Sequence, residues 1–329
     1  MSNSPATSPQ LLPAVTLPPV HLARHVPGAT AAKLLRDGKW QRIRRGAYVE
    51  PSALTVSPGR HATATRRALA RISGVVEAAR ARGGDTPVLS HESAALLWGL
   101  RLWRLPEQVH VVSAHNPSSR AAPDIVRHVL TLGAEDVTER GGVRLTTLER
   151  TVVDIARGRR VPHGLVVADD ALRHGADPAA MAALVNSQPG RRGVRRARTV
   201  LTLADARAES PWETFTRLHA LAAGLPAPEL QIVVATRLGE FRADMGWRDW
   251  RVLIEFDGLV KYTDLSGGDP GRVVFEEKRR HDALVEAGWR ILRLTRDDFR
   301  DVAALHRRLV ALVPPSVRDV LTPQRHLLL

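Results

Sequence analysis

The sequence predicts a mixed α+β protein built from several modules. Its 329 residues suggest two or three domains. Apolar residues make up 44% and charged residues 25%, which is typical of a folded globular chain. Helical and strand-like patterns alternate along it. We therefore expect a small winged-helix-like module, a middle α/β domain, and a C-terminal core with the element order helix, strand, strand, strand, helix, strand.

Composition shifts place the boundaries between these modules. We expect a flexible, proline-rich tail over 1–20, a winged-helix-like module over 21–60, a middle domain over 61–186, a basic linker or connecting helix over 187–208, and a C-terminal domain over 209–329. The tail lacks the basic and apolar regions of a signal peptide. No apolar run approaches the roughly 18 residues of a membrane helix. We therefore expect a cytoplasmic protein without a membrane segment, and the absence of cysteine excludes disulfides and thiolate chemistry.

The net charge of +14 is concentrated in the N-terminal part of the chain. Residues 21–83 hold thirteen basic and three acidic side chains, and residues 84–208 hold seventeen and thirteen. Residues 209–329 hold eighteen of each and are neutral. An excess of positive charge favours polyanionic partners such as nucleic acid. Binding and chemistry are therefore expected in different parts of the chain.

The first module predicts a surface for nucleic acid. A short helix over 29–37 ends at Gly38, and a hairpin over 40–49 turns at Gly46. A winged helix presents such a basic hairpin to DNA phosphates. A long helix over 58–82 and the linker add further arginines. The alternative is an arginine-rich, solvated surface. The candidate contacts are Arg42, Arg44, Arg45, Arg66, Arg67, Arg191 and Arg192.

The middle domain shows no group of residues whose pattern indicates catalysis or metal binding. Arg150 and Asp154 are four residues apart on a predicted helix over 146–157, and we interpret them as an exposed ion pair. The three histidines of this region lie on separate predicted elements without the spacing of metal ligands, and we interpret them as structural; they are His91, His110 and His128.

These two regions resemble the AbiEi-type antitoxin family. The resemblance rests on Ser90–Ala95 (SHESAA), Val109–Val111 (VHV) and Thr147–Arg157 (TLERTVVDIAR), with Gly46–Val49 (GAYV) at the wing. It implies transcriptional autoregulation and a cognate toxin as a partner. The stretch before Ala29 is broken by prolines and departs from a complete helix-turn-helix.

The C-terminal third carries the pattern of a catalytic site. Ser210 and Glu213 form a capping box at the start of a helix, and strands are expected over 231–237, 240–245 and 251–257, followed by a helix over 273–287 and a strand over 289–295. Glu255 and Asp257 project side by side from the third strand, within reach of Asp244 on the second. Converging carboxylates repel one another unless a cation compensates them, which favours Mg²⁺ or Mn²⁺. The alternative is that Asp244 and Asp257 are ordinary hairpin and turn residues and that Glu255 lies on an open face of the sheet.

This third also resembles the PD-(D/E)XK nuclease superfamily, and most closely its branch related to the Vsr repair endonuclease. The matching segments are Gly239–Asp244 (GEFRAD), Ile254–Gly258 (IEFDG) and Glu277–Arg293. The resemblance implies a restriction-endonuclease-like core, with metal ligands at Asp244 and Glu255 and a further acid at Glu213. The usual motif lysine is replaced by Asp257, so Lys261 and Lys278 are candidates for its role.

Two functions follow from these patterns. The first is a metal-dependent endonuclease, with DNA preferred over RNA as its substrate. Asp244, Glu255, Asp257 and Glu213 would hold the metal, and the basic N-terminal half would hold the nucleic acid. The second is a non-catalytic DNA-binding regulator or antitoxin that keeps a nuclease-like fold as an interaction domain.

Overall fold

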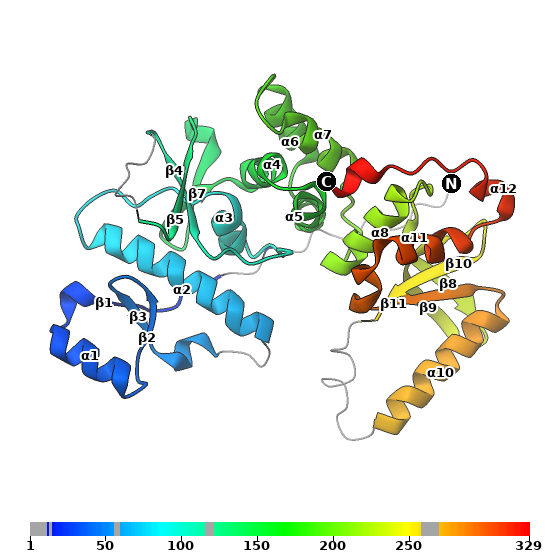
Figure 1. Cartoon of the computed structure of the whole chain (residues 1–329), viewed down its shortest axis with the longest axis horizontal. Helices are drawn as coiled ribbons and strands as arrows, with labels where there is room; N and C mark the ends of the chain where they lie inside the picture. Colours follow the sequence, from blue (N-terminus) through cyan, green and yellow to red (C-terminus); the bar gives the residue numbers. More distant parts are fainter. Residues whose placement is uncertain (1–11, 13–14, 56–59, 116–121, 258–269) are drawn as a thin grey trace. The chain divides into compact units, whose positions relative to one another are not determined.

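The protein is an α+β protein that divides into two compact units, described here from a computed structural model (Figure 1). The structure describes residues 12, 15–55, 60–115, 122–257 and 270–329. Unit 1 comprises residues 1–159 and 163–204, and unit 2 comprises residues 160–162 and 205–329.

The N-terminal part of unit 1 is a three-stranded sheet with helices α1 and α2. The sheet order is β1-β3-β2, and the hairpin predicted from the sequence is the antiparallel pair of β2 and β3. Gly46 has a φ of +75°, which favours glycine and allows the tight turn between these strands. The elements are β1 (His21–Leu22), α1 (Gly28–Arg36), β2 (Gln41–Arg44), β3 (Ala47–Val49) and α2 (Arg60–Arg80).

The remainder of unit 1 combines two small sheets with helices. Strands β4 and β5 are parallel, β6 and β7 are antiparallel, and Leu89 bridges Val111 and Leu145 of the two pairs. The elements are α3 (His91–Trp98), β4 (Val109–Ser113), β5 (Ile125–Val129), β6 (Val137–Arg140), β7 (Val143–Thr146), α4 (Leu148–Gly158), α5 (Val161–Arg173), α6 (Pro178–Asn186) and α7 (Val194–Leu203). The basic segment 187–208 contains α7, which contacts α4 and α6.

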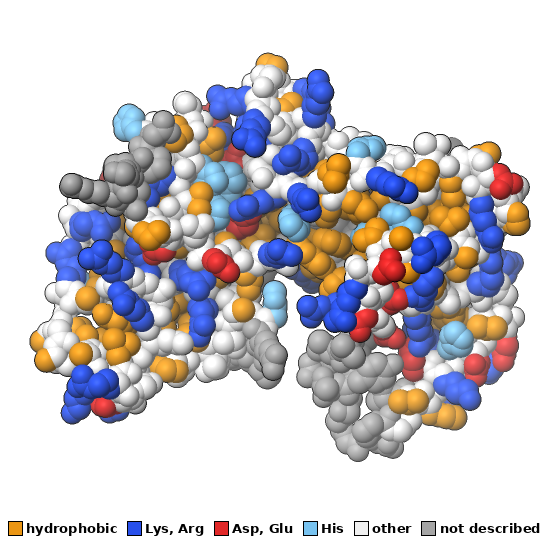
Figure 2. Space-filling view, viewed as in Figure 1, with side chains coloured by type: hydrophobic (Ala, Val, Ile, Leu, Met, Phe, Trp, Pro, Cys, Tyr) orange, Lys and Arg blue, Asp and Glu red, His pale blue; other side chains and the backbone are white. Residues whose placement is uncertain are grey.

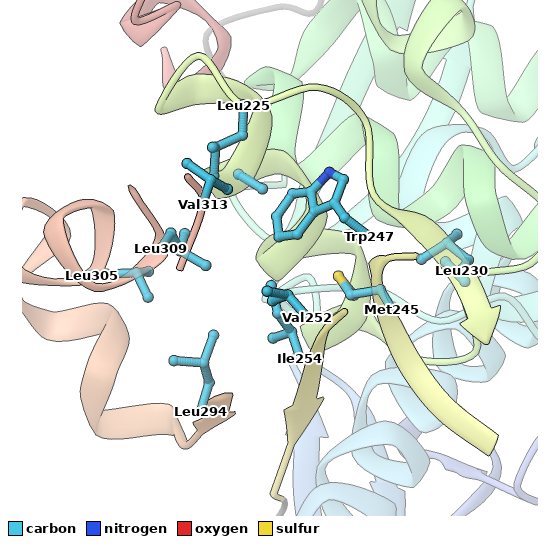
Figure 3. Close-up of a cluster of buried hydrophobic side chains, with 12 residues drawn as sticks. Leu225, Leu230, Met245, Trp247, Val252, Ile254, Leu294, Leu305, Leu309 and Val313 are labelled. Carbon is cyan, nitrogen blue, oxygen red and sulfur yellow. The ribbon is translucent and has the colours of Figure 1, made fainter. Parts of the chain in front are cut away.

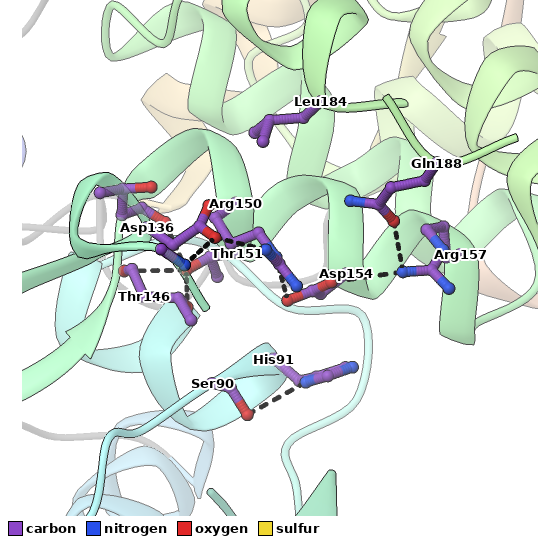
Figure 4. A network of polar contacts seen from close by, with 12 residues as sticks. Ser90, His91, Asp136, Thr146, Arg150, Thr151, Asp154, Arg157, Leu184 and Gln188 are labelled. Atoms are coloured by element: carbon purple, nitrogen blue, oxygen red, sulfur yellow. Dashed lines mark hydrogen bonds and ion pairs between the residues drawn. The ribbon is translucent and has the colours of Figure 1, made fainter. Parts of the chain in front are cut away.

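Arg150 and Asp154 form a buried pair, so the expectation of an exposed pair was wrong (Figure 4). Arg150 Nε donates to Asp154 at 3.0 Å, and its Nη1 donates to Asp136 at 2.7 Å. Asp154 also lies 3.7 Å from Nη1 of Arg157. The physical reason is that Asp136, just before β6, supplies a second carboxylate, and two carboxylates satisfy the buried guanidinium.

Over the described residues 205–257 and 270–329, unit 2 has the core element order that the sequence predicts. Its sheet order is β11-β10-β9-β8, in which β10 and β11 are parallel and the other pairs are antiparallel. The core elements are α8 (Pro211–Ala222), β8 (Glu229–Thr236), β9 (Gly239–Trp247), β10 (Val252–Phe256), α10 (Pro270–Glu286) and β11 (Arg290–Leu294). Helices α11 (Val302–Ala311) and α12 (Pro315–Arg318) follow.

Apolar side chains cover both faces of this sheet. Val252 and Ile254 belong to the larger core, which includes Leu305 and Leu309 of α11 (Figure 3). Leu253 points to the opposite face, where Leu284 of α10 lies. The alternation follows from the two-residue period of a strand. It places Glu255 on the face of α10.

Within the described residues, none of the helices combines the length and the apolar character that a membrane span requires.

Candidate active site

Four polar residues form one row across the sheet of unit 2. Glu255 is paired with Arg293 of β11. Ile254 is paired with Met245, so the next position along β10 brings Glu255 opposite Asp244 of β9. The register of β8 and β9 continues the row to Gln231. Since directly opposed residues are neighbours, the fold brings together the two acids that the sequence predicts as metal ligands.

The sheet is irregular at this row. Leu230 and Ile232 are two residues apart, yet they lie in the cores on opposite faces of the sheet. A regular strand would place both on one face. Gln231 between them has a φ of +57°, which is a sparsely populated region for a residue with a side chain. Backbone strain of this kind concentrates at functional sites.

Glu213 reaches this row from the first turn of α8. Ser210 accepts a hydrogen bond from the Glu213 amide at 3.1 Å, which is the Ser210 half of the predicted capping box. The Glu213 carboxylate accepts from the amide of Glu209 at 2.8 Å and from Nε2 of Gln231 at 2.9 Å. Burial, and secondarily the negative charge of Asp244, raise the pKa of Glu213 to about 7. Glu213 is therefore both part of the helix cap and a member of the acidic cluster.

Glu255 lies between two arginines. Arg280 of α10 donates to Oε1 of Glu255, and Nε of Arg293 lies 3.5 Å from Oε2. Glu277 of α10 pairs with both arginines. Burial raises the pKa of Glu255, and these arginines oppose that rise. The amide of Phe256 donates to Asp244 at 2.7 Å, which fixes the second acid at the end of β10.

The other predicted catalytic residues have different outcomes. Asp257 is half-buried just after β10, where its amide donates to the carbonyl of Leu294 at 2.8 Å. Lys261 lies outside the described residues. Lys278 is exposed on α10, whereas Arg280 contacts Glu255. Two helical residues two positions apart point in nearly opposite directions, so Arg280 and Lys278 cannot both face the row.

The donor atoms of this site suit Mg²⁺ or Mn²⁺, but they are not already arranged around a single metal position. In the part of the chain that the structure describes, no three His, Asp or Glu side chains are placed to hold a metal ion together. The reason at Glu255 is that both of its oxygens face arginines. Carboxylate oxygens are nevertheless the ligands that Mg²⁺ prefers, and a bound cation would oppose both burial and the charge of Asp244, the two largest causes that raise the pKa of Glu213. The residues therefore fit a divalent cation by their chemistry.

Two of the predicted nucleic-acid contacts instead form hydrogen bonds within the protein. Nε of Arg44 donates to Asp124 at 2.7 Å, and Arg66 donates to the carbonyls of Ala53 and Thr16. The remaining candidates are exposed, and Figure 2 shows Lys and Arg side chains spread over unit 1; these candidates are Arg42, Arg45, Arg67, Arg191 and Arg192. The basic surface expected from the sequence is therefore smaller by two arginines.

Sequence reasoning missed the roles of Gln231, Arg280 and Arg293. Gln231 appears in the sequence only as the beginning of a strand, and nothing marks its backbone conformation. Arg293 could have been found, because a parallel fourth strand places it beside Glu255.

Comparison with known proteins identifies two relatives of this chain. Both are described as uncharacterized proteins of Mycobacterium tuberculosis: MT2308 of strain CDC 1551 / Oshkosh and Rv2248 of strain ATCC 25618 / H37Rv. Each is 36% identical over 154 residues, which cover 46% of this chain and 54% of the relative. The chain thus spans about half the length of the relatives it matches. No protein-family model and no solved structure matches it.

Proposed function

We propose that unit 2 is a metal-dependent nuclease that hydrolyses the phosphodiester bonds of nucleic acid, with DNA preferred over RNA. The observation that carries this proposal is the row of Asp244 and Glu255 on neighbouring strands, with Glu213 buried beside Asp244 at a pKa of about 7. A buried acid that is this hard to ionise costs stability at neutral pH, and such a cost is typical of functional sites.

Asp244, Glu255 and Glu213 would hold the metal in this site. Mg²⁺ bound there would activate water and neutralise charge on the phosphodiester. Gln231 orients the Glu213 carboxylate through its amide. Arg280 and Arg293 fix the Glu255 carboxylate and place positive charge where a phosphate group would approach. They supply the cationic character that Asp257 cannot provide at the position of the usual motif lysine.

The test is cleavage of plasmid, single-stranded DNA and RNA by the purified full chain with Mg²⁺, Mn²⁺ or EDTA. We expect cleavage that depends on the metal, and a fall of at least about 100-fold in Asp244→Asn and Glu255→Gln, since each substitution removes a metal ligand. DNA binding, measured by fluorescence anisotropy, should persist in both variants because the binding arginines lie in unit 1.

The matched control is Glu286→Gln on α10. Glu286 is an exposed glutamate that pairs with Arg237 and lies outside the polar row. It should cleave as the unmodified chain does. Equal cleavage by the unmodified chain and by both active-site variants would identify a contaminating nuclease and contradict the proposal.

A second candidate function is a non-catalytic DNA-binding regulator of the antitoxin type, with a cognate toxin as its partner. The observation that favours it is that both oxygens of Glu255 already face arginines, so the site is partly neutralised without a metal. This candidate predicts DNA binding but no cleavage of any substrate under any metal condition.

A further inference from the structure

Unit 1 contains a second cluster of titratable side chains, far along the chain from the acidic row. His91 and Glu92 begin α3, His110 lies in β4 and His128 in the neighbouring β5. The sequence separates these residues, but the parallel pairing of β4 and β5 brings them together beside α3.

Two nitrogens and one oxygen converge in this cluster. Nδ1 of His110 lies 2.9 Å from Nε2 of His128 and 3.6 Å from Oε2 of Glu92. The ring of His91 stacks on that of His128 with centroids 3.5 Å apart, and the hydroxyl of Ser90 contacts Nδ1 of His91. The stacking holds the His128 ring in the orientation that directs Nε2 toward His110.

One carboxylate oxygen in the cluster has no hydrogen-bond partner. Oε1 of Glu92 pairs with Arg159, whereas Oε2 is buried and unsatisfied. Burial favours the neutral acid, but the hydrogen bond from Arg159 holds the pKa of Glu92 below its usual value. A buried, charged oxygen without a partner costs free energy, and such an atom commonly marks a bound ion or water.

We propose that Glu92, His110 and His128 form a binding site for a transition-metal ion of the Zn²⁺ class. Zinc bonds of about 2.0–2.1 Å place tetrahedral ligands roughly 3.3 Å apart. The distances of 2.9 Å and 3.6 Å lie on either side of this value. No group of described residues is already spaced for a metal, so binding replaces the contact of His110 with His128 and draws Glu92 inward.

The ligand type supports this assignment. Imidazole nitrogens favour zinc, nickel or copper, whereas the oxygen ligands of unit 2 favour Mg²⁺, so the two sites differ in the metals they select. Glu92 and Arg159 also line a pocket of about 260 Å³ within unit 1. The hydroxyl of Ser93 accepts a hydrogen bond from the His110 amide at 2.8 Å and anchors that strand.

The test uses the untagged full chain, freed of metal with a chelator and titrated with Co²⁺ and then Zn²⁺. Excess Mg²⁺ is present to occupy the acidic row of unit 2. Co²⁺ held by nitrogen and oxygen ligands gives visible ligand-field absorption, and Zn²⁺ should displace this signal at one ion per chain. Glu92→Gln and His128→Gln should each weaken binding at least about tenfold. Circular dichroism confirms that these variants are folded.

The matched controls are His326→Gln, an exposed histidine of unit 2, and Glu286→Gln, an exposed glutamate of α10 outside both proposed metal sites. Both should bind Co²⁺ and Zn²⁺ as the unmodified chain does. Absence of ligand-field absorption from the unmodified chain would overturn the proposal, whatever the folding of the variants. Unchanged affinity in His128→Gln would also overturn it.

Discussion

Unit 1 and unit 2 each bury a network of charged side chains. We call the network of unit 1 balanced, because two buried acids share a guanidinium, and that of unit 2 unbalanced, because the buried Glu213 lies near a second acid. In unit 1, the guanidinium of Arg150 bridges Asp136 and Asp154 (Figure 4). In unit 2, the Glu213 carboxylate accepts hydrogen bonds from the Glu209 amide and from Gln231, and it lies close enough to Asp244 to be affected by its charge. Removing one partner from a complete buried ion pair is costly, whereas a buried acid with a raised pKa is a candidate for a functional site.

The largest effect is expected from breaking the balanced network. Arg150→Met leaves Asp136 and Asp154 buried without their guanidinium partner. Removing one partner of a buried pair costs about 3–5 kcal/mol, because an uncompensated charge remains. Urea denaturation should show this loss in the free energy of unfolding of unit 1.

Glu77→Gln is the matched control for this prediction. Glu77 pairs with Arg80 on the surface of α2, with both side chains well exposed. Exposed pairs contribute about 1 kcal/mol or less, so this variant should unfold almost as the unmodified chain does. Equal losses in Arg150→Met and Glu77→Gln would show that the buried network is not structural.

The second effect is expected from the unbalanced network. The folded pKa of Glu213 is about 7, against an ordinary value of 4.5. The folded state therefore keeps a proton that the unfolded state has lost, and the stability of unit 2 falls as pH rises from about 4.5 through 7. The full cost above pH 7 is about 3 kcal/mol, since one pKa unit corresponds to about 1.4 kcal/mol.

Glu213→Gln should remove this fall in stability. The free energy of unfolding should be measured from pH 4.5 to 8. The value for the variant should increase relative to that of the unmodified chain as pH rises. At pH 8, Mg²⁺ should stabilise the unmodified chain more than Glu213→Gln, because the cation compensates the ionised carboxylate. A stability profile that is the same in both proteins would mean that Glu213 titrates normally.

The difference between the networks also explains how much the sequence could predict. The alternation in β10 and the capping box at Ser210 are local patterns, and they correctly predicted which way Glu255 faces and how α8 begins. The burial of Arg150 depends on Asp136, which the fold brings in from fourteen residues earlier. The backbone of Gln231 is likewise set by the sheet around it. The local periodicity of the sequence therefore predicts neither the burial of Arg150 nor the backbone conformation of Gln231.

The smallest effects are expected on the basic surface of unit 1, where two neighbouring arginines have different environments. Arg45 is exposed, whereas Arg44 donates to Asp124 and to the carbonyl of Gly74. If the wing holds phosphate, Arg45→Ala should weaken DNA binding several-fold on any sequence. It should also reduce the slope of log affinity against log salt by about 1.

Arg44→Ala should change stability instead, because it removes a half-buried ion pair that joins the hairpin to residues outside it. Fluorescence anisotropy on labelled duplex DNA at several salt concentrations, together with urea denaturation, separates the two effects. Loss of affinity in Arg44→Ala without loss of stability would place Arg44 at the DNA after all. Unchanged affinity and slope in Arg45→Ala would show that the β2–β3 hairpin does not bind DNA. Nucleic acid would then have to bind to α2 or to the arginines that precede α7.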